Sequence, residues 1–585
     1  MKILLITPPL LQPNTPYAAT PLLTAWLKSQ GHDAVQSDLS LNLLLKLFSR
    51  EGITALSNEL GIPLEEAGPY LETIDPVLAF LQNRNPDAVS RILKRGWLPE
   101  GEHLARAYDM ENQLGWNFRG LEPEDRARYL ASLYLDDIAD VAAELDPNFG
   151  FSRYAEKLAS SLPAFEPVRD ELEQGDSLFF QWLEELTDHE MRRHAPEMVV
   201  LTVPFPGCLL GALIIARRIN YTCAGVKIVM GGGYVNTELR QLSDPAVFDY
   251  VDYITLDSGF LPLKQLAEGG TPVRTFKREN GAVVFQTSEM EEVRHADLPP
   301  PDFQGLELDD YFGVFETLNP VTRLWSDERW NKLVLAHGCC WSRCAFCDTS
   351  IDYICRYDPA DPAVICDWIE QVIAQTGFDG FHFVDEALPH DLVDGLCDEL
   401  LRRGLEIEWW GNIRFEKRFS TGLIRKMADA GCIAVTGGLE TGCDRTLKLM
   451  RKGITIAHAE RVLTDLAEAG ILTHAYLMYG FPTQTEAETF QTLETVRDLF
   501  DRGILHSAFW HRFALTAHSD LSLHPDKYSI AVPPHEPAAF ALNEIAFESE
   551  FDHDPGRIGY ALERATYNYM LGLGLDRQVE EWAEY

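Results

Sequence analysis

The second half of the chain repeats one pattern six times, a short apolar run followed by a helix-like segment. The candidate strands are 332–336, 380–384, 406–410, 433–436, 473–478 and 506–510. The helical stretches between them include 363–375, 392–403, 423–430, 457–469 and 486–500. Parallel strands need crossover connections, and helices usually supply them. Six such units predict a partial barrel whose ligands lie at the carboxyl ends of the strands.

The first part of the chain alternates in the same way but is interrupted. Strand-like runs are expected at 2–8, 33–37, 198–203, 227–230 and 250–256. Because helix-like segments alternate with them, a doubly wound parallel sheet is predicted. Between 41 and 193 the sequence is helix-like, acidic and poor in strand signals, so this stretch is interpreted as an insertion into one α/β domain.

The expected fold class is therefore α/β, with five segments. They are a doubly wound, Rossmann-like domain (1–40 and 194–285), a helical insertion (41–193), a linker (286–328), a partial (β/α)6 TIM-like barrel (329–520) and a C-terminal helical cap (521–585).

Composition limits the partners and the compartment. The 585 residues carry a formal net charge of −40, which repels phosphate backbones, so no nucleic acid partner is expected. No run of 18 apolar residues occurs, and the first nine residues are too short for a signal peptide, so no membrane association is expected. The eleven cysteines form only one cluster, which indicates a reducing, cytoplasmic location and a metal site instead of disulfides.

That cluster follows the first barrel strand and spaces Cys340, Cys344 and Cys347 as C-x3-C-x2-C. Three thiolates can hold three irons of a [4Fe–4S] cluster and leave the fourth iron open. A zinc knuckle is the alternative, and it needs a fourth ligand. The candidates for that ligand are Cys339, His337 and Cys355. Cys339 does not fit the spacing and is interpreted as a spectator.

This spacing at the top of a partial barrel resembles the radical SAM superfamily. The resemblance implies a [4Fe–4S] cluster whose open iron is chelated by the amino and carboxylate groups of S-adenosylmethionine (SAM). Cleavage of the C5′–S bond would then yield a 5′-deoxyadenosyl radical. It also implies that Phe346 lies beside the cofactor, and that an electron donor such as flavodoxin or ferredoxin is a partner.

The ends of the later strands match the SAM-binding positions of that family. By this resemblance, Asp385 and Glu386 lie where the SAM amino group binds, and Arg414 pairs with the carboxylate. Glu440 would bond to the ribose or the methionyl group. The remaining matching positions are Gly437, Gly438 and Gly480. The run 447–453 also matches, whereas Thr483 and Gln484 replace the Gly and Glu of the motif G-F-P-G-E-T.

An α/β domain ahead of such a barrel resembles the cobalamin (B12)-binding-domain radical SAM family. By that resemblance the cobalamin-binding residues are Thr202, Gly231, Gly232, Gly233 and Gly259. The motif D-x-H-x-x-G, whose His ligates cobalt, is absent, since the loop after the first strand reads PPLLQP at 8–13. A degenerate domain that binds no cobalamin is therefore an alternative.

The resemblance implies a methyltransferase that acts on an unactivated carbon of a small molecule or peptide. Two other functions stay open: a radical cyclase or rearrangement enzyme without methyl transfer, and a non-enzymatic cobalamin- or redox-sensing module with a zinc knuckle. Tyr479 and His511 are the candidate catalytic proton or hydrogen-bond groups. Of the consecutive Trp409 and Trp410, only one can face the barrel lumen, because successive residues of a strand point to opposite faces.

Overall fold

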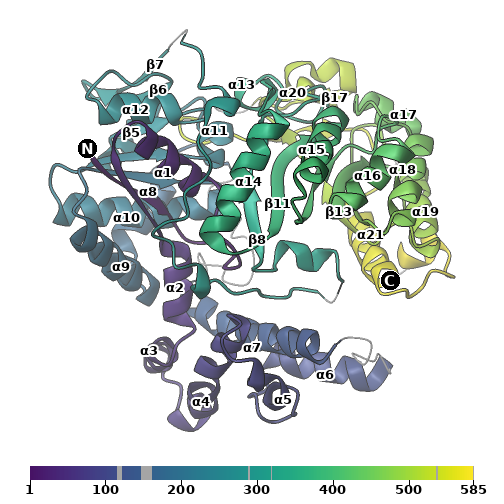
Figure 1. Ribbon diagram of the computed structural model, residues 1–585, viewed down its shortest axis with the longest axis horizontal. Coiled ribbons are helices and arrows are strands. Elements are labelled where there is room, and N and C mark those ends of the chain that lie inside the picture. The colour runs from purple at the N-terminus through teal and green to yellow at the C-terminus, as the bar shows by residue number, and fades with distance from the viewer. Residues whose placement is uncertain are drawn as a thin grey trace.

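The computed structural model describes residues 1–114, 122–146, 161–287, 290–317, 319–534, 538–551 and 553–583. Two parallel sheets lie side by side, and a lobe of helices projects below them (Figure 1). The expected α/β class is confirmed. No helix within these described ranges is long and apolar enough to cross a membrane.

The N-terminal sheet has the order β2-β1-β3-β4-β5-β6-β7. Its parallel strands are β1 Lys2–Thr7, β2 Asp33–Asp38, β3 Met198–Thr202, β4 Lys227–Gly231 and β5 Tyr253–Thr255. The chain runs from β1 outward to β2 on one side and returns to β3 on the other. The strand order therefore reverses beside β1, and ligands of such sheets bind at the carboxyl ends near this point.

An antiparallel hairpin that the sequence analysis did not predict extends this sheet. It consists of β6 Thr275–Glu279 and β7 Ala282–Gln286. Asn280 and Gly281 have φ angles of 51° and 82°, and positive φ at both central residues is typical of a type I′ turn. The Asn-Gly pair between two short runs was the signal that could have revealed this hairpin.

The predicted insertion is helical. Its helices are α2 Leu39–Leu47, α3 Arg50–Leu60, α4 Leu64–Leu81, α5 Val89–Ile92, α6 Glu102–Leu114, α7 Pro123–Leu145, α8 Glu166–Gln174 and α9 Leu178–His194. Helices α3 to α7 form the lower lobe of Figure 1, and α9 returns to pack on α10 (Leu209–Thr222). Their apolar faces join β1 and β3 in one core, so the insertion is anchored to one face of the N-terminal sheet.

The second sheet is a partial barrel of six parallel strands in the order β15-β14-β13-β12-β11-β8. The strands are β8 Trp330–Leu333, β11 Gly380–Leu388, β12 Glu408–Ile413, β13 Cys432–Glu440, β14 Leu472–Tyr479 and β15 Ser507–Arg512. The intervening helices are α14 Pro362–Thr376, α15 His390–Arg403, α16 Thr421–Asp429, α17 Asp444–Leu449, α18 Ile456–Glu468 and α19 Glu486–Asp501. β8 and β15 are the two edges, so the barrel is open between them.

The two sheets share an apolar core. It runs from α1 (Ala19–Ser29) and α12 (Phe260–Ala267), on the second face of the N-terminal sheet, into the helices of the barrel. Burial of such a continuous core provides a large part of the folding free energy. The core also holds the carboxyl edge of the N-terminal sheet next to the barrel.

The C-terminal segment is only partly the helical cap that was predicted. Helix α21 (Pro555–Met570) packs on α19 and on the edge strand β15. It begins at Asp554, whose side chain accepts a hydrogen bond from the Gly556 amide, and Pro555 occupies its first turn. Before α21 lie the short helix α20 (Asp520–Leu523) and two-stranded ribbons, which pair β16 (Leu515–Thr516) with β18 (Glu544–Ile545) and β17 (Ile530–Ala531) with β19 (Glu548–Ser549).

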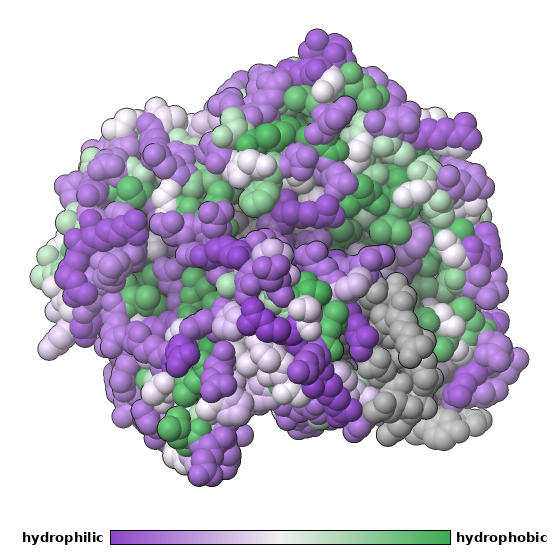
Figure 2. All heavy atoms as spheres, turned by 60° about the horizontal axis from the view of Figure 1, so that its bottom comes forward, coloured by the Kyte–Doolittle hydropathy of each residue, from purple (hydrophilic) through white to green (hydrophobic). Residues whose placement is uncertain are grey.

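The surface reflects the composition. Figure 2 shows that hydrophilic residues cover most of the face turned toward the viewer, with apolar residues gathered in smaller areas between them. This pattern is ordinary for a globular protein and by itself indicates no partner.

Candidate functional site

The three predicted cluster ligands lie on one loop at the top of the barrel. This loop runs between two short paired strands, β9 (Ala336–His337) and β10 (Asp358–Pro359), and contains helix α13 (Asp352–Cys355). Gly338 has a φ of 71°, and a Cβ there would collide with the Arg356 carbonyl, so this tight turn needs glycine. The Ala345 amide donates to the Met450 carbonyl at 2.8 Å and ties the loop to the end of α17.

The thiols themselves are arranged in pairs. The thiols of Cys344 and Cys347 interact, and this interaction lowers the pKa of the Cys344 thiol. The Cys340 Sγ donates to the Ala387 carbonyl at 3.4 Å. Over the described ranges, no three Cys, His, Asp or Glu side chains converge in the manner of a single-ion site. Thiolates of a [4Fe–4S] cluster each bind a separate iron and need not converge on one point.

Two cations lie among these thiols. Arg414 acts electrostatically on Cys339, Cys340 and Cys344, and Lys452 acts on Cys344 and Cys347. A cluster held by three thiolates is anionic, so adjacent cations favour it. The donor set and its charge surroundings therefore fit an iron–sulfur cluster.

Arg414 is held by an aromatic ring and a carbonyl. Its guanidinium lies 4.2 Å from the Trp341 ring centroid, and it donates to the Lys452 carbonyl. The Trp341 indole donates to the Arg451 carbonyl at 3.0 Å. The buried Arg414 Nε has no hydrogen-bond partner, and its nearest carboxylate, Glu416, lies 3.7 Å away. Arg414 can therefore accept a further anion, such as a carboxylate.

The end of β13 carries a buried ion pair. Lys452 Nζ lies 2.7 Å from Glu440 Oε1, and the two side chains are 11% and 8% exposed. Glu440 adopts a left-handed backbone with a φ of 64°. A Cβ at Gly438 would collide with both partners, so this glycine leaves room for the pair. The neighbouring Gly437 passes close to the Ile413 carbonyl of β12, which a Cβ would approach to 2.6 Å.

Asp385 and Glu386, at the end of β11, have different surroundings. The Asp385 carboxylate accepts hydrogen bonds from the Leu335 and Ala336 amides, at 3.0 and 2.7 Å, and so braces the end of β8. Burial raises the pKa of the Asp385 carboxyl to about 7. Glu386 is exposed and forms no hydrogen bond with the part of the chain that the structure describes. Of these two residues, Glu386 is therefore the one available to a ligand.

Two further predicted positions lie around the cluster loop and the end of β14. The Phe346 ring lies 5.9 Å from Lys452 Nζ, beside the cysteines. Gly480 has a φ of 72°, and a Cβ there would lie 3.3 Å from Pro555 of the C-terminal helix. Phe346 therefore lies at the cluster, whereas Gly480 shapes the junction with α21.

The two predicted catalytic residues are separated. The Tyr479 ring packs tightly on Gly559 of α21 and is only 8% exposed, so it lies in the core behind the barrel. On β15, His511 pairs with the residue that precedes Tyr479 on β14. The His511 ring lies 6.1 Å from the ring of Tyr476. Since residues alternate faces along a strand, Tyr479 and Tyr476 point to opposite sides of β14. Of the two predicted catalytic residues, His511 is the one on the lumen face of the barrel.

The alternation also separates the two tryptophans, as predicted. Trp409 packs in the helix-side core and donates to the Ala430 carbonyl at 2.9 Å. Trp410 points the other way, where its ring stacks on the His382 imidazole at 3.5 Å. Trp410 is therefore the tryptophan that faces the lumen.

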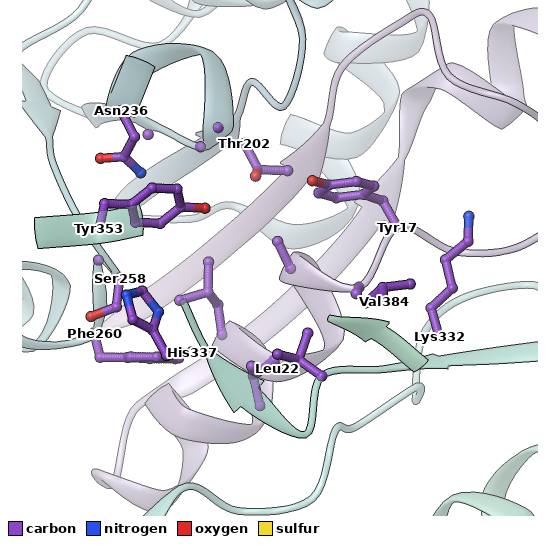
Figure 3. Close-up of a pocket in the computed structure, with 18 of the residues that line it drawn as sticks. Tyr17, Leu22, Thr202, Asn236, Ser258, Phe260, Lys332, His337, Tyr353 and Val384 are labelled. Atoms are coloured by element: carbon purple, nitrogen blue, oxygen red, sulfur yellow. The ribbon is translucent and has the colours of Figure 1, made fainter. Parts of the chain in front are cut away.

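A cavity of about 460 Å³ lies between the carboxyl edge of the N-terminal sheet and the barrel (Figure 3). All five residues predicted to bind cobalamin line it, namely Thr202, Gly231, Gly232, Gly233 and Gly259. Asp385 and Glu386 line it from the barrel side. The structure thus brings the two sets of predicted residues, over 120 positions apart in the chain, to one space.

The glycine turn presents bare backbone to this cavity. Gly232 has a φ of 119°, and a Cβ there would collide with Val203. At Gly231 and Gly233, a Cβ would lie 2.9 Å from Thr255 Oγ1 and 2.8 Å from the Pro204 carbonyl. A turn without side chains lets a large ligand approach closely, so the residues present fit a nucleotide-tailed cofactor. The histidines among the described lining residues are His295, His337 and His382, all outside the N-terminal sheet.

Sequence reasoning did not single out several residues of this region. Lys452 lies in the run 447–453 that matched the family, but only the fold shows its pairing with Glu440. Trp341 lies inside the cysteine motif and could have been noticed as an aromatic residue between two ligands. Lys332 and Tyr353, which line the cavity, carried no sequence signal.

The chain is similar to known proteins in part of its sequence. Residues 334–496 match the Radical SAM superfamily. The chain is 22% identical over 326 residues to an uncharacterized methyltransferase, PH0819, of Pyrococcus horikoshii, covering 53% of this chain and 66% of the relative. It is 23% identical over 217 residues to cytidylyl-2-hydroxyethylphosphonate methyltransferase of Streptomyces wedmorensis, covering 36% and 40%. The chain thus spans less than two thirds of these relatives' lengths.

Two solved structures are similar to this chain. The cobalamin-dependent SAM radical enzyme OxsB, with aqua-cobalamin bound, superposes with a TM-score of 0.50 at 14% identity, over 65% of this chain and 59% of that chain. The radical SAM methyltransferase TsrM from Kitasatospora setae gives a TM-score of 0.48 at 16% identity, over 70% and 86%. The likeness to OxsB supports the arrangement of an α/β domain ahead of a partial barrel.

Proposed function

We propose, from the premise that residues 334–496 form a radical SAM domain, that this chain is a cobalamin-dependent radical SAM methyltransferase. One observation carries the proposal. A single cavity is lined on one side by the glycine turn of the N-terminal sheet and on the other by Glu386. The next residue on that strand, Ala387, contacts the Cys340 thiol through its carbonyl. The predicted cobalamin and cluster sites thus adjoin the same strand end.

In this proposal the chain's residues bind and orient the cofactors. Cys340, Cys344 and Cys347 hold a [4Fe–4S] cluster, and Arg414, whose Nε makes no hydrogen bond to a described residue, binds the SAM carboxylate. Glu386 binds the amino group, and the Lys452–Glu440 pair fixes the end of β13. When bound, the cluster and cobalamin supply the electron for SAM cleavage and the transferable methyl group.

The proposed substrate is a small molecule or peptide that is methylated at an unactivated carbon. The two relatives named methyltransferases support the methyl-transfer class. His511 is the lumen group available to contact that substrate.

The test is anaerobic reconstitution of the full chain with iron, sulfide and hydroxocobalamin, followed by incubation with SAM and a strong reductant. We expect cluster and corrin absorption bands in one purified species and 5′-deoxyadenosine as a product. S-adenosylhomocysteine formed beside it supports methyl transfer. 5′-Deoxyadenosine alone, with no corrin retained, would instead favour radical chemistry without methyl transfer, and an iron-free protein that holds zinc would contradict the whole proposal.

Trp341 is expected to position Arg414 for SAM. Replacement by alanine removes the ring under the guanidinium, and a desolvated cation–π contact contributes up to about 2 kcal/mol. We expect Trp341→Ala to raise the SAM dissociation constant roughly tenfold, which corresponds to about 1.4 kcal/mol. Trp341→Phe keeps a ring and should stay within about threefold of the native constant. Equilibrium dialysis, together with iron content as a check on the cluster, distinguishes a positioning role from loss of the loop, in which case both measurements would change.

A further inference from the structure

Lys332 is a cation of the cavity with no hydrogen-bond or ion-pair partner among the described residues. It lies on β8, at the wall shared by the barrel and the N-terminal domain, and it lines the cavity. In Figure 3 its side chain lies on the same side as Tyr17 and Val384, opposite Tyr353 and Ser258. No hydrogen bond or ion pair joins Lys332 to any residue in the described ranges. Among the described lining residues, it is the only Lys or Arg.

Of the acidic lining residues, Asp38, Asp257 and Asp385 are already occupied, and Glu386 lies four positions beyond His382 along β11. Asp38 is the opposing charge that acts on Lys332, but its carboxylate accepts hydrogen bonds from the Leu41 amide at 2.9 Å and from the Tyr311 hydroxyl at 2.8 Å. Asp257 pairs with Arg240 at 2.5 Å. The Asp385 oxygens accept backbone amides. Lys332 is therefore a half-buried charge whose acidic neighbours accept hydrogen bonds or ion pairs from other groups.

The other neighbours of Lys332 do not supply charge. His382 is its register partner on β11, and the imidazole is stacked flat on Trp410 with an interplanar angle of 11°. Burial holds the pKa of His382 well below its usual range, so this ring is neutral at pH 7. Burial also lowers the pKa of Lys332 to about 8, which leaves the amine mostly protonated at pH 7. Partial desolvation of an ammonium that has no ion-pair partner is unfavourable, and a bound anion offsets this cost.

We propose that the Lys332 end of the cavity is a subsite for an anionic group of the substrate, a carboxylate, phosphonate or phosphate. This inference rests on the proposed function, because it assigns the occupant of the same cavity. A lysine binds such groups as a point charge and sets no geometry, so the three chemistries are equivalent here. From His382 to Glu386, β11 rises about 13 Å. The substrate's anion thus lies on the order of 10 Å from the SAM-binding strand end.

Chemical labelling of the native full chain tests this subsite. Acetic anhydride at pH 7 acetylates accessible neutral amines, and mass spectrometry of the peptides follows Lys332 beside the exposed Lys94 as reference. Propionate, methylphosphonate and inorganic phosphate are the probes, each compared with chloride at equal ionic strength. We expect each probe to slow acetylation of Lys332 at least threefold and to leave Lys94 unchanged. Equal rates in probe and chloride would overturn the proposal.

The phosphodiester of cobalamin is another possible anion, and a second measurement separates it from the substrate. Hydroxocobalamin is titrated onto the native chain and the Lys332→Gln variant. We expect the two dissociation constants to agree within about twofold, and the anions still to protect Lys332 in the cobalamin-loaded chain. A tenfold weaker constant for the variant, with no anion protection in the loaded chain, would assign Lys332 to the cofactor and overturn the inference. Neither readout requires SAM cleavage, so failure of the radical chemistry would be recognised separately.

Discussion

Replacing Cys340, Cys344 or Cys347 singly with alanine is expected to abolish the cluster and SAM cleavage. Each thiolate binds its own iron, so loss of one leaves an iron exposed and the cluster unstable. After anaerobic reconstitution, iron should fall from about four per chain to near zero, and 5′-deoxyadenosine should be undetectable. Iron analysis and the absorption spectrum measure the first effect, and chromatography of the products measures the second.

Cys339→Ala is the matched control, because this cysteine adjoins Cys340 but does not fit the spacing. It should keep the full iron content and at least half of the native rate of SAM cleavage. If Cys339→Ala removed the cluster and Cys340→Ala did not, the ligand assignment within this pair would be reversed. Circular dichroism of each variant shows whether the loss of iron is separate from loss of the fold.

Lys452→Met is expected to have the second largest effect. The substitution removes the cation from a buried pair and leaves the Glu440 carboxylate without a counter-charge. Breaking a buried ion pair by removing one partner costs about 3–5 kcal/mol of folding free energy. The variant should therefore show a large fall in the urea midpoint, and SAM binding should weaken more than tenfold because Glu440 is no longer held.

A double-variant cycle with Glu440→Gln isolates the pair. We expect Glu440→Gln/Lys452→Met to be more stable than Lys452→Met alone, because no uncompensated charge remains. Additive losses in the two single variants would show that the residues act independently and would contradict the pairing. Lys448→Met serves as the surface control, since Lys448 lies on the same segment without an ion pair to any described residue, and it should change the midpoint little.

Much of the fold was predictable because its signals are local. The barrel strands β11 to β15 are apolar runs next to helices, and each was expected within about two residues at its start. The first strand was less well placed: β8 runs from Trp330 to Leu333, whereas 332–336 was expected. The last residues of the expected strand leave the sheet in a bend where the Ala336 amide donates a hydrogen bond to the Asp385 carboxylate. The two residues are 49 positions apart, so the local sequence does not indicate this contact.

The face of the barrel to which a strand side chain points was harder to predict than the position of the strand in the sequence. A parallel strand buried on both faces has no polar–apolar alternation to reveal which side faces the lumen. Tyr479 was therefore expected as a catalytic proton or hydrogen-bond group and instead packs against Gly559 of α21. For Trp409 and Trp410 the period of two was enough, because the prediction required only that they diverge.

The sequence alone determined the identity and spacing of the chemistry-bearing residues. The covalent chain itself fixes the C-x3-C-x2-C spacing, so no tertiary contact is needed to place the three thiols on one loop. Only the tertiary structure decided which charges are satisfied: Lys452 by Glu440, Asp38 by Leu41 and Tyr311, and Lys332 by none of the described residues. The reason is that pairing depends on distances of a few ångströms between segments up to 273 positions apart, which only the packed core establishes.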